Sequence, residues 1–321
     1  MENLDGRIAV VTGGGTGIGR GLVRQLAEAG AHVAMCDVSE ENMAESRELA
    51  TKEAPAGTRV TTFVADVADE SAVVAFGAHV RDAHDTDHVH LVVNNAGIGG
   101  GGSFIEADRA EWDRTFDVCW KGVYHGCRVF VPMLIAAAEG HLVNISSVNG
   151  FWASIGPETA HTAYSAAKFA VKGFTEALVN DFRLHAPHVG VSVVMPGHIG
   201  TSIIINSAKI LGFEPDALTD ADLDGMRAMI ERRGIDASGF TDDQLRDFVK
   251  MRGEWFRDNA PTTADEAAAV ILGGVREGVW RILIGDDARI LDEHVRATPE
   301  DAYEQSFMQR QVEAGGIGLN L

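Results

Sequence analysis

Short apolar runs rich in β-branched residues alternate along the chain with longer segments in which apolar positions recur every three or four residues. Runs of the first kind are typical of strands buried in a parallel sheet, and segments of the second kind are typical of amphipathic helices. This alternation indicates an α/β fold. The predicted strands are Arg7–Thr12, His32–Cys36, Arg59–Val64, Val89–Val93, Leu142–Ile145, Val191–Met195 and Trp280–Ile284.

Helix boundaries are predicted from apolar spacing and from capping residues. The longest predicted helix is Glu111–Ala138, bent near Pro132, and a second, buried helix covers Ala163–Leu178. Two more helices are expected to begin at Thr241 and Thr263, because each threonine is followed three residues later by Gln or Glu, the capping-box pattern.

Composition narrows the class of protein. The 321-residue chain is 45% hydrophobic and 23% charged, which is typical of a globular protein. Its formal net charge of −20 argues against nucleic acid or an anionic membrane as a partner. The N-terminus is polar and no apolar stretch is long enough to span a bilayer, so we expect a cytoplasmic protein. The cysteines lack metal-ligand spacing and are expected to be reduced thiols.

A glycine-rich stretch, Gly13-Gly14-Gly15-Thr16-Gly17-Ile18-Gly19, connects the first strand to a helix that ends at Gly30. Glycines in this position let the backbone approach a pyrophosphate, and the helix N-terminus supplies N–H groups and the positive end of its dipole. The alternative is a flexible turn without a ligand. Strand, glycine loop and helix in this order favour dinucleotide binding.

Carboxylates follow the next two predicted strands. Asp37, after the second strand, can accept hydrogen bonds from both ribose hydroxyls of an adenosine and would repel a 2′-phosphate, which favours NAD(H) over NADP(H). Asp66-Val67, after the third strand, is suited to the adenine edge. A helix-capping role for Asp66 is less favoured, because Asp69 lies closer to the helix expected near Ser71.

Further polar residues follow the fourth and fifth strands. Asn94-Asn95-Ala96-Gly97 suits close packing of the backbone against a ribose, with the Asn side chains connecting adjacent strands. Ser146-Ser147 follows the fifth strand, where ligands of open α/β sheets bind, although a surface turn is the alternative.

Tyr164 and Lys168 are four residues apart and therefore share one face of the predicted helix. A nearby ammonium group favours the phenolate and is expected to lower the pKa of the tyrosine, which would make the pair suitable for acid/base catalysis. Such pairs also occur by chance in helices.

Three histidines and two aspartates lie within His84–His90 and raise the possibility of a metal site. We interpret this stretch as a solvated polar loop and expect no metal.

Taken together, Thr12-Gly13-x-x-x-Gly17-x-Gly19, Asn94-Asn95-Ala96-Gly97, Ser147, Tyr164-x-x-x-Lys168 and Pro196-Gly197 appear in order at compatible spacing. Over about Gly6–Thr201 the chain resembles the short, single-domain branch of the short-chain dehydrogenase/reductase family. The resemblance implies a Rossmann-like, doubly wound parallel sheet of about seven strands with helices on both faces. It also implies a nicotinamide cofactor and a homotetramer or homodimer.

The resemblance assigns roles to individual residues. Tyr164 becomes the general acid/base, Ser147 orients the substrate oxygen, and Lys168 binds the nicotinamide ribose and lowers the pKa of the tyrosine. Thr201 and the backbone near Ile199 would hold the carboxamide. The cofactor-binding residues are then Gly13, Thr16, Gly17, Ile18, Gly19, Asp37, Asp66, Val67, Asn94, Ala96, Gly97, Tyr164, Lys168, Pro196, Ile199 and Thr201.

The chain departs from the family pattern within its catalytic region. Cys119 stands where the family usually has an Asn that helps to hold a water molecule in a proton relay. Cysteine is a weak hydrogen-bonding group, and we interpret it as a small core residue rather than a nucleophile. The loop between Ser147 and Tyr164 is longer than usual and places Phe151, Trp152 and His161 near the substrate entrance or in packing roles.

The chain is also expanded after Thr201. Residues 202–260 form an enlarged substrate-binding segment within a single domain of residues 1–285, and residues 286–321 form a C-terminal helical extension with a predicted helix start at Thr298-Pro299. This extension has few apolar residues near its end, so we expect it not to contribute to a core.

The leading hypothesis is therefore an NAD(H)-dependent oxidoreductase that interconverts a secondary alcohol and a ketone as small-molecule substrates. Apolar residues in the enlarged segment favour a hydrophobic or aromatic substrate: Ile203–Ile205, Ile210, Leu211 and Phe213. The alternatives are a dehydratase or epimerase that retains its cofactor, and a nicotinamide-binding sensor without turnover.

Overall fold

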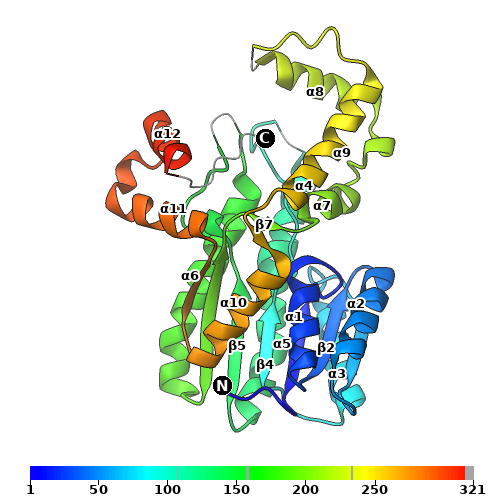
Figure 1. Ribbon diagram of the computed structural model, residues 1–321, viewed down its shortest axis with the longest axis vertical. Helices are drawn as coiled ribbons and strands as arrows, with labels where there is room; N and C mark the ends of the chain where they lie inside the picture. The colour runs from blue at the N-terminus through cyan, green and yellow to red at the C-terminus, as the bar shows by residue number, and fades with distance from the viewer. Residues whose placement is uncertain (107, 157–158, 233, 315–321) are drawn as a thin grey trace.

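A seven-stranded, fully parallel sheet forms the centre of the computed structural model, which describes residues 1–106, 108–156, 159–232 and 234–314 (Figure 1). The strand order is β3-β2-β1-β4-β5-β6-β9, which confirms the predicted doubly wound Rossmann-like fold. The ends of the predicted strands are shifted by one or two residues. The strands are β1 (Ile8–Thr12), β2 (His32–Asp37), β3 (Val60–Val64), β4 (Leu91–Asn94), β5 (Gly140–Ile145), β6 (Val189–Pro196) and β9 (Arg281–Ile284).

Helices cover both faces of the sheet because its strands are apolar on both sides. One face packs against α1 (Gly17–Glu28), α2 (Glu40–Glu53) and α10 (Ala264–Glu277). The other face packs against α3 (Glu70–His84), α4 (Arg109–Phe116), α5 (Gly122–Ala136) and α6 (Thr162–His185). This arrangement leaves the carboxyl ends of the strands available for a ligand site.

The predicted helix Glu111–Ala138 is wrong in detail. A π-helical turn, Asp117–Lys121, separates α4 from α5 and holds Cys119. Pro132 lies within α5. The extra residue per turn of a π-helix rotates the following side chains, and such turns are frequent at functional sites.

Local capping signals place other helices correctly. Thr241 begins α9 (Asp242–Asp258) and Thr263 begins α10, each through a complete capping box. Asp69 caps α3 by accepting a hydrogen bond from the Ser71 main chain at 2.8 Å. The Tyr164 helix, α6, runs to His185 and is longer than predicted.

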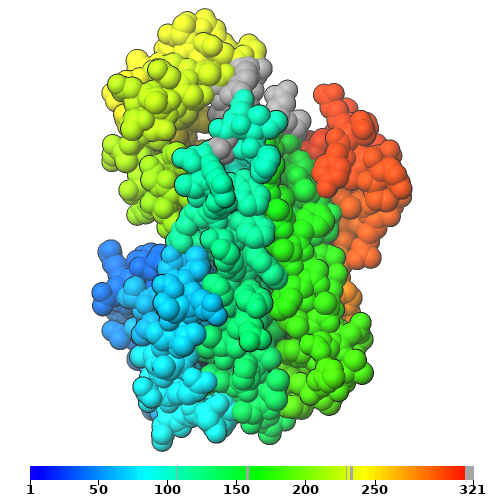
Figure 2. Space-filling view, turned by 180° about the vertical axis from the view of Figure 1, so that it is seen from behind, coloured from blue at the N-terminus to red at the C-terminus, as the bar shows by residue number. Residues whose placement is uncertain are grey.

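The enlarged segment comprises α7 (Ile203–Leu211), α8 (Asp220–Arg232) and α9. Helices α8 and α9 project beyond the carboxyl end of the sheet, and in the space-filling view this segment forms a separate yellow lobe (Figures 1 and 2). The lobe has its own small core of buried leucines: Leu218, Leu223 and Leu245.

The C-terminal extension comprises α11 (Asp286–Ala297), a 3-10 turn at Pro299–Asp301 and α12 (Gln305–Glu313), and residues 315–321 lie outside the described residues. Contrary to the sequence-based expectation, this extension builds a core. Phe307 is fully buried against Trp152, with ring centroids 6.0 Å apart. Ala288, Leu291 and Ala302 of the extension belong to the same buried cluster, so a few apolar residues spread along α11 and α12 create a core in a mostly polar tail.

Candidate functional site

The glycine loop between β1 and α1 has no space for side chains where it closes. A Cβ atom on Gly19 would lie 1.9 Å from the Gly13 carbonyl oxygen. The loop is held from outside: the Arg20 guanidinium donates to the Gly15 carbonyl at 2.7 and 3.0 Å, and Asn95 Nδ2 donates to the Gly13 carbonyl at 3.2 Å. Thr16, the residue preceding α1, makes no side-chain cap, so the helix N-terminus keeps the N–H groups suited to phosphate oxygens.

Asp37 lies at the end of β2 beside this loop. Its Oδ2 accepts a hydrogen bond from Gly15 N at 3.0 Å, and its Oδ1 accepts one from Ser39 N at 3.1 Å. The carboxylate is half-buried and is fixed beside the glycine loop at the end of β2.

Asp66 has a partner that the sequence did not reveal. Its Oδ2 accepts a hydrogen bond from Arg114 Nη1 of α4 at 2.7 Å, and its Oδ1 accepts one from Ala68 N at 3.0 Å. Val67 is buried, and its carbonyl accepts a hydrogen bond from His125 at 3.1 Å. The ion pair orients Asp66 across the end of β3.

The Asn94 side chain does not face the cofactor site. Its Nδ2 donates to Asn144 Oδ1 at 2.8 Å, between β4 and β5, and Asn144 in turn donates to Thr175 of α6 at 3.0 Å. The expectation that this Asn connects adjacent strands is confirmed, and its predicted cofactor contact would have to be made by its main chain. Ala96 N is fixed by Thr12 Oγ1 at 3.0 Å.

Helix α7 covers the opposite side of the glycine loop. Asn206 Nδ2 donates to Thr16 Oγ1 at 3.1 Å, and Thr201 packs beside Gly17. Between Pro196 at the end of β6 and Thr201, the chain forms the short strand β7 (Ile199–Gly200), which pairs with β8 (Thr262–Thr263). The predicted cofactor residues of this segment therefore lie beside those of the glycine loop.

The structure brings the three predicted catalytic residues together. Ser147 follows β5 and caps a 3-10 turn, with its Oγ accepting a hydrogen bond from Asn149 N at 3.1 Å. The Ser147 hydroxyl lies close enough to the Tyr164 phenol to act on its pKa, and Lys168 Nζ lies 5.3 Å from the centre of the Tyr164 ring. Ser146 instead donates to the Lys168 carbonyl at 2.8 Å, a structural role that agrees with the choice of the second serine.

The expected lowering of the Tyr164 pKa is wrong for this structure. Burial raises the pKa of the phenol, a thiolate at Cys119 would add to the rise, and the nearby Ser147 hydroxyl only partly offsets it. Burial also lowers the pKa of Lys168, whose ammonium donates to the Ile145 carbonyl at 3.0 Å rather than to the phenol. Desolvation is therefore the largest influence on both pKa values.

Cys119 lies behind this pair, in the π-helical turn. Its Sγ is fully buried and donates to the Ile98 carbonyl at 3.1 Å, and burial raises the pKa of the thiol. A neutral, hydrogen-bonded thiol is a poor nucleophile, which supports the interpretation of Cys119 as a core residue.

Residues of the lengthened loop before α6 have different roles: one packs in a core and another lies beside the catalytic residues. Trp152 is buried and its Nε1 donates to the Ala302 carbonyl at 2.7 Å, so it has a packing role. The His161 ring lies over Tyr164 with centroids 4.7 Å apart, and burial lowers the pKa of His161 to about 4. Pro157 and Glu158 of this loop lie outside the described residues.

The histidine-rich stretch is not the solvated loop that we expected. His84 is buried at the end of α3, with a ring nitrogen 2.9 Å from Thr61 Oγ1, and His90 accepts a hydrogen bond from Ile8 N at 3.1 Å. In the described part of the chain, no group of three or more His, Cys, Asp or Glu residues could hold a metal ion. No helix there is long and apolar enough to cross a membrane.

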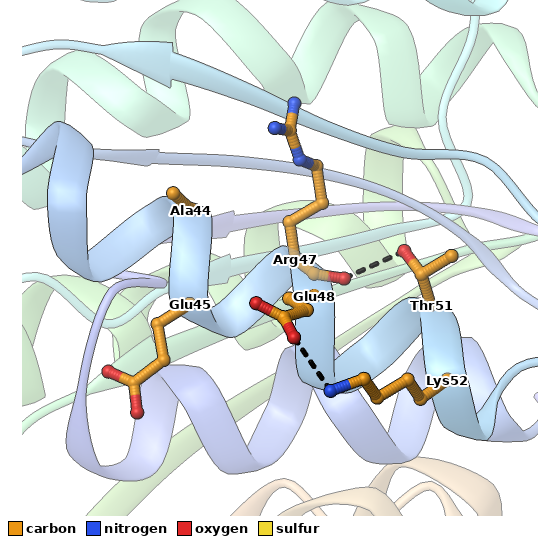
Figure 3. Close-up of a pocket in the computed structure, with 6 residues that line it drawn as sticks. All are labelled: Ala44, Glu45, Arg47, Glu48, Thr51 and Lys52. Carbon is orange, nitrogen blue, oxygen red and sulfur yellow. Dashed lines mark hydrogen bonds and ion pairs between the residues drawn. The ribbon is translucent and has the colours of Figure 1, made fainter.

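Of two surface hollows formed by described residues, one adjoins the predicted site residues and the other does not. The hollow in Figure 3, of about 620 Å³, lies along α2, has a Glu48–Lys52 ion pair of 2.6 Å and contains none of the predicted site residues. The second, of about 370 Å³, is lined by Gly17, Thr201 and the start of α10. The second hollow therefore borders two of the predicted cofactor-binding residues, Gly17 and Thr201.

Comparisons with known proteins agree with this geometry. Residues 7–209 match the family model for short chain dehydrogenases. "Putative oxidoreductase SadH" from Mycobacterium tuberculosis is 34% identical over 315 residues, covering 98% of this chain and 97% of that protein.

Solved structures give the same result. A short chain dehydrogenase/reductase from Burkholderia phymatum in complex with NAD has a TM-score of 0.74 at 28% identity, covering 94% of this chain and 95% of the other. A metagenomic short-chain oxidoreductase in complex with NADP has a TM-score of 0.53 at 34% identity, covering 60% of this chain and 83% of the other. The chain belongs to the short-chain dehydrogenase/reductase family of oxidoreductases, whose members bind a nicotinamide cofactor.

Proposed function

We propose that the protein is an NAD(H)-dependent oxidoreductase that interconverts a secondary alcohol and a ketone. The observation that carries this proposal is the convergence of Ser147, Tyr164 and Lys168 at the carboxyl ends of the strands. A buried phenol beside a serine hydroxyl can give a proton to a carbonyl oxygen or take one from an alcohol.

Each residue around the phenol would have a separate role in the reaction. Ser147 would hold the substrate oxygen beside Tyr164, which moves the proton, and Lys168 would supply positive charge that favours the phenolate. When bound, the nicotinamide donates or accepts the hydride. The crowded glycine loop, the uncapped start of α1 and the fixed Asp37 all suit its dinucleotide.

Sixteen residues make up the proposed cofactor site. They come from the glycine loop, the ends of β2 to β4, helix α6 and the segment after β6: Gly13, Thr16, Gly17, Ile18, Gly19, Asp37, Asp66, Val67, Asn94, Ala96, Gly97, Tyr164, Lys168, Pro196, Ile199 and Thr201.

The enlarged segment supports a hydrophobic or aromatic substrate. Helix α7 lies over the loop that follows β4: Ser207 accepts a hydrogen bond from Gly99 N at 2.8 Å, and Leu211 packs against Gly100. On its other side α7 contacts α9, where Ile204 and Ile205 lie beside Gly253. The entrance beside the catalytic residues would thus have an apolar wall, which favours a substrate without many hydroxyl groups.

The proposed function is tested by NADH formation from NAD⁺ across a panel of hydrophobic and aromatic secondary alcohols, with NADP⁺ in parallel. Turnover with NAD⁺ and not with NADP⁺ is the expected result. If NADH binds but no alcohol in the panel is turned over, the proposed reaction is contradicted in favour of a sensor. If cofactor copurifies and is never consumed, dehydratase or epimerase chemistry replaces it.

Asp37→Ala is expected to change cofactor preference. Without the carboxylate, the ribose hydroxyls lose their acceptor and a 2′-phosphate is no longer repelled, so KM for NAD⁺ should rise by about tenfold and NADP⁺ should become a measurable substrate. Steady-state kinetics with both cofactors measure the change. Asp69→Ala, which removes a helix cap instead, is the matched control and should leave the preference unchanged. Unaltered preference in Asp37→Ala would contradict the assignment of Asp37.

We also propose that the protein forms a homodimer or homotetramer through α5 and α6. Large apolar side chains are exposed there in the single chain: Tyr124, Ile135 and Phe169 are 41%, 44% and 42% exposed. Burying such residues is a usual reason for self-association. Light scattering would give the number of subunits.

A further inference from the structure

The segment Gly197–Thr201, which the proposed function assigns to the nicotinamide end of the cofactor, is enclosed by two parts of the chain that lie beyond the matched family region. Helix α9 of the enlarged segment lies against it, and α11 of the C-terminal extension contacts its start. Both helices come after residue 209, where the family match ends. Helices outside the matched family region therefore determine where the segment lies.

Asp287, in the first turn of α11, makes the direct contact. Its Oδ2 accepts a hydrogen bond from His198 N at 2.7 Å, and its side chain is only 6% exposed. A Cβ atom on Gly197 would lie 2.3 and 2.4 Å from the two carboxylate oxygens. The carboxylate thus fills the space that a side chain at position 197 would need. It also accepts the hydrogen bond of the His198 main-chain N–H group.

Stability alone does not account for a carboxylate here. Asp287 Oδ1 is buried, and no hydrogen-bond partner is found for it among the described residues. Burial raises the pKa of Asp287, as expected where the charged form is poorly solvated. A buried carboxylate with an oxygen left without a partner is unfavourable for folding, so a role in the site explains its presence better.

Helix α9 holds the same segment from the other side. The His198 imidazole is hydrogen-bonded through Nε2 to the Phe256 carbonyl at 2.7 Å and lies against the Phe256 ring at 4.2 Å. A Cβ atom on Gly200 would lie 2.7 Å from the Arg257 carbonyl oxygen. His198 therefore connects α11, through its main chain, with α9, through its side chain.

We propose that Asp287 is a positioning residue that fixes Gly197–Thr201 for the nicotinamide cofactor, so that the C-terminal extension contributes to cofactor affinity through the main chain of His198. This inference rests on the proposed function, because Ile199 and Thr201 are assigned to the cofactor there. The role is one of geometry: a segment held in place before binding loses less conformational freedom when the cofactor arrives.

The test compares two neighbouring carboxylates. Asp287→Ala removes the acceptor for His198 N, whereas Asp286→Ala, the matched control, removes a side chain that is 88% exposed and paired only with Arg289 among the described residues. Fluorescence titration with NADH is expected to give a Kd on the order of 10-fold higher for Asp287→Ala and unchanged for Asp286→Ala. Asp287→Asn keeps an acceptor oxygen and should restore most of the affinity.

Hydrogen exchange of the protein without cofactor separates this inference from the proposed function. Faster exchange within residues 197–201 is expected in Asp287→Ala and not in Asp286→Ala, whether or not NADH binds. Exchange unchanged in Asp287→Ala, or an unchanged Kd for NADH, would overturn the inference. Failure of the unsubstituted protein to bind NADH would instead contradict the proposed function. Should Asp287→Ala fail to fold, Asp287→Leu, which fills the space without supplying an acceptor for His198 N, serves in both measurements.

Discussion

Tyr164→Phe is expected to lower kcat by at least about 100-fold, the usual size of a general acid/base contribution, while the Kd for NADH stays close to that of the unsubstituted protein. The change removes only the hydroxyl group, which lies beside Ser147. The ring remains, and with it the packing against His161 and the position of Lys168. Turnover is measured with the best alcohol of the panel, and binding by NADH fluorescence.

The chain supplies a control for this substitution. Tyr124, on α5, is 41% exposed and lies outside the site, so Tyr124→Phe should leave both kcat and the Kd for NADH unchanged. If Tyr164→Phe keeps its turnover, Tyr164 has no part in the mechanism and the proposed reaction needs another acid. If it loses NADH binding as well, the phenol contributes to the cofactor site rather than to proton transfer alone.

Phe307→Ala should lower the free energy of unfolding by about 3–5 kcal/mol, the range for truncating a fully buried aromatic side chain. Phe307 has no exposed surface and packs in the cluster that also contains Trp152, Val148 and Leu291. The truncation leaves a cavity beside Trp152, because Nε1 of that residue remains bonded to the Ala302 carbonyl. Urea denaturation followed by tryptophan fluorescence gives the difference.

An exposed phenylalanine provides the comparison for Phe307. Phe104 is 76% exposed, and Phe104→Ala should change the free energy of unfolding by no more than about 0.5 kcal/mol, as for most surface substitutions. Equal stability of Phe307→Ala and the unsubstituted protein would show that the C-terminal extension detaches from the rest of the molecule in solution.

Features that depend on neighbouring residues in the sequence could be predicted. The strands follow from runs of β-branched residues, and the starts of α9 and α10 follow from capping boxes at Thr241 and Thr263. Tyr164 and Lys168 could be paired because four residues make about one helical turn. Each of these relations is contained within a few positions of the chain.

Features that depend on distant residues could not be predicted. The ion pair of Asp66 with Arg114 joins the end of β3 to α4, and the hydrogen bond of Asn94 with Asn144 joins two strands 50 residues apart. The pKa of Tyr164 was misjudged for the same reason: sequence spacing shows the nearby ammonium group but not the burial that outweighs it.

The bond between Trp152 and Ala302 also bears on how the protein is made. The two residues are 150 positions apart, so a ribosome must synthesise everything between them before the indole can be covered. Until then, the nascent chain carries an exposed tryptophan five residues after Ser147, a surface that chaperones bind and that favours aggregation. Synthesis rate and chaperone supply should therefore affect the yield of this protein more than its alternating α/β pattern would suggest.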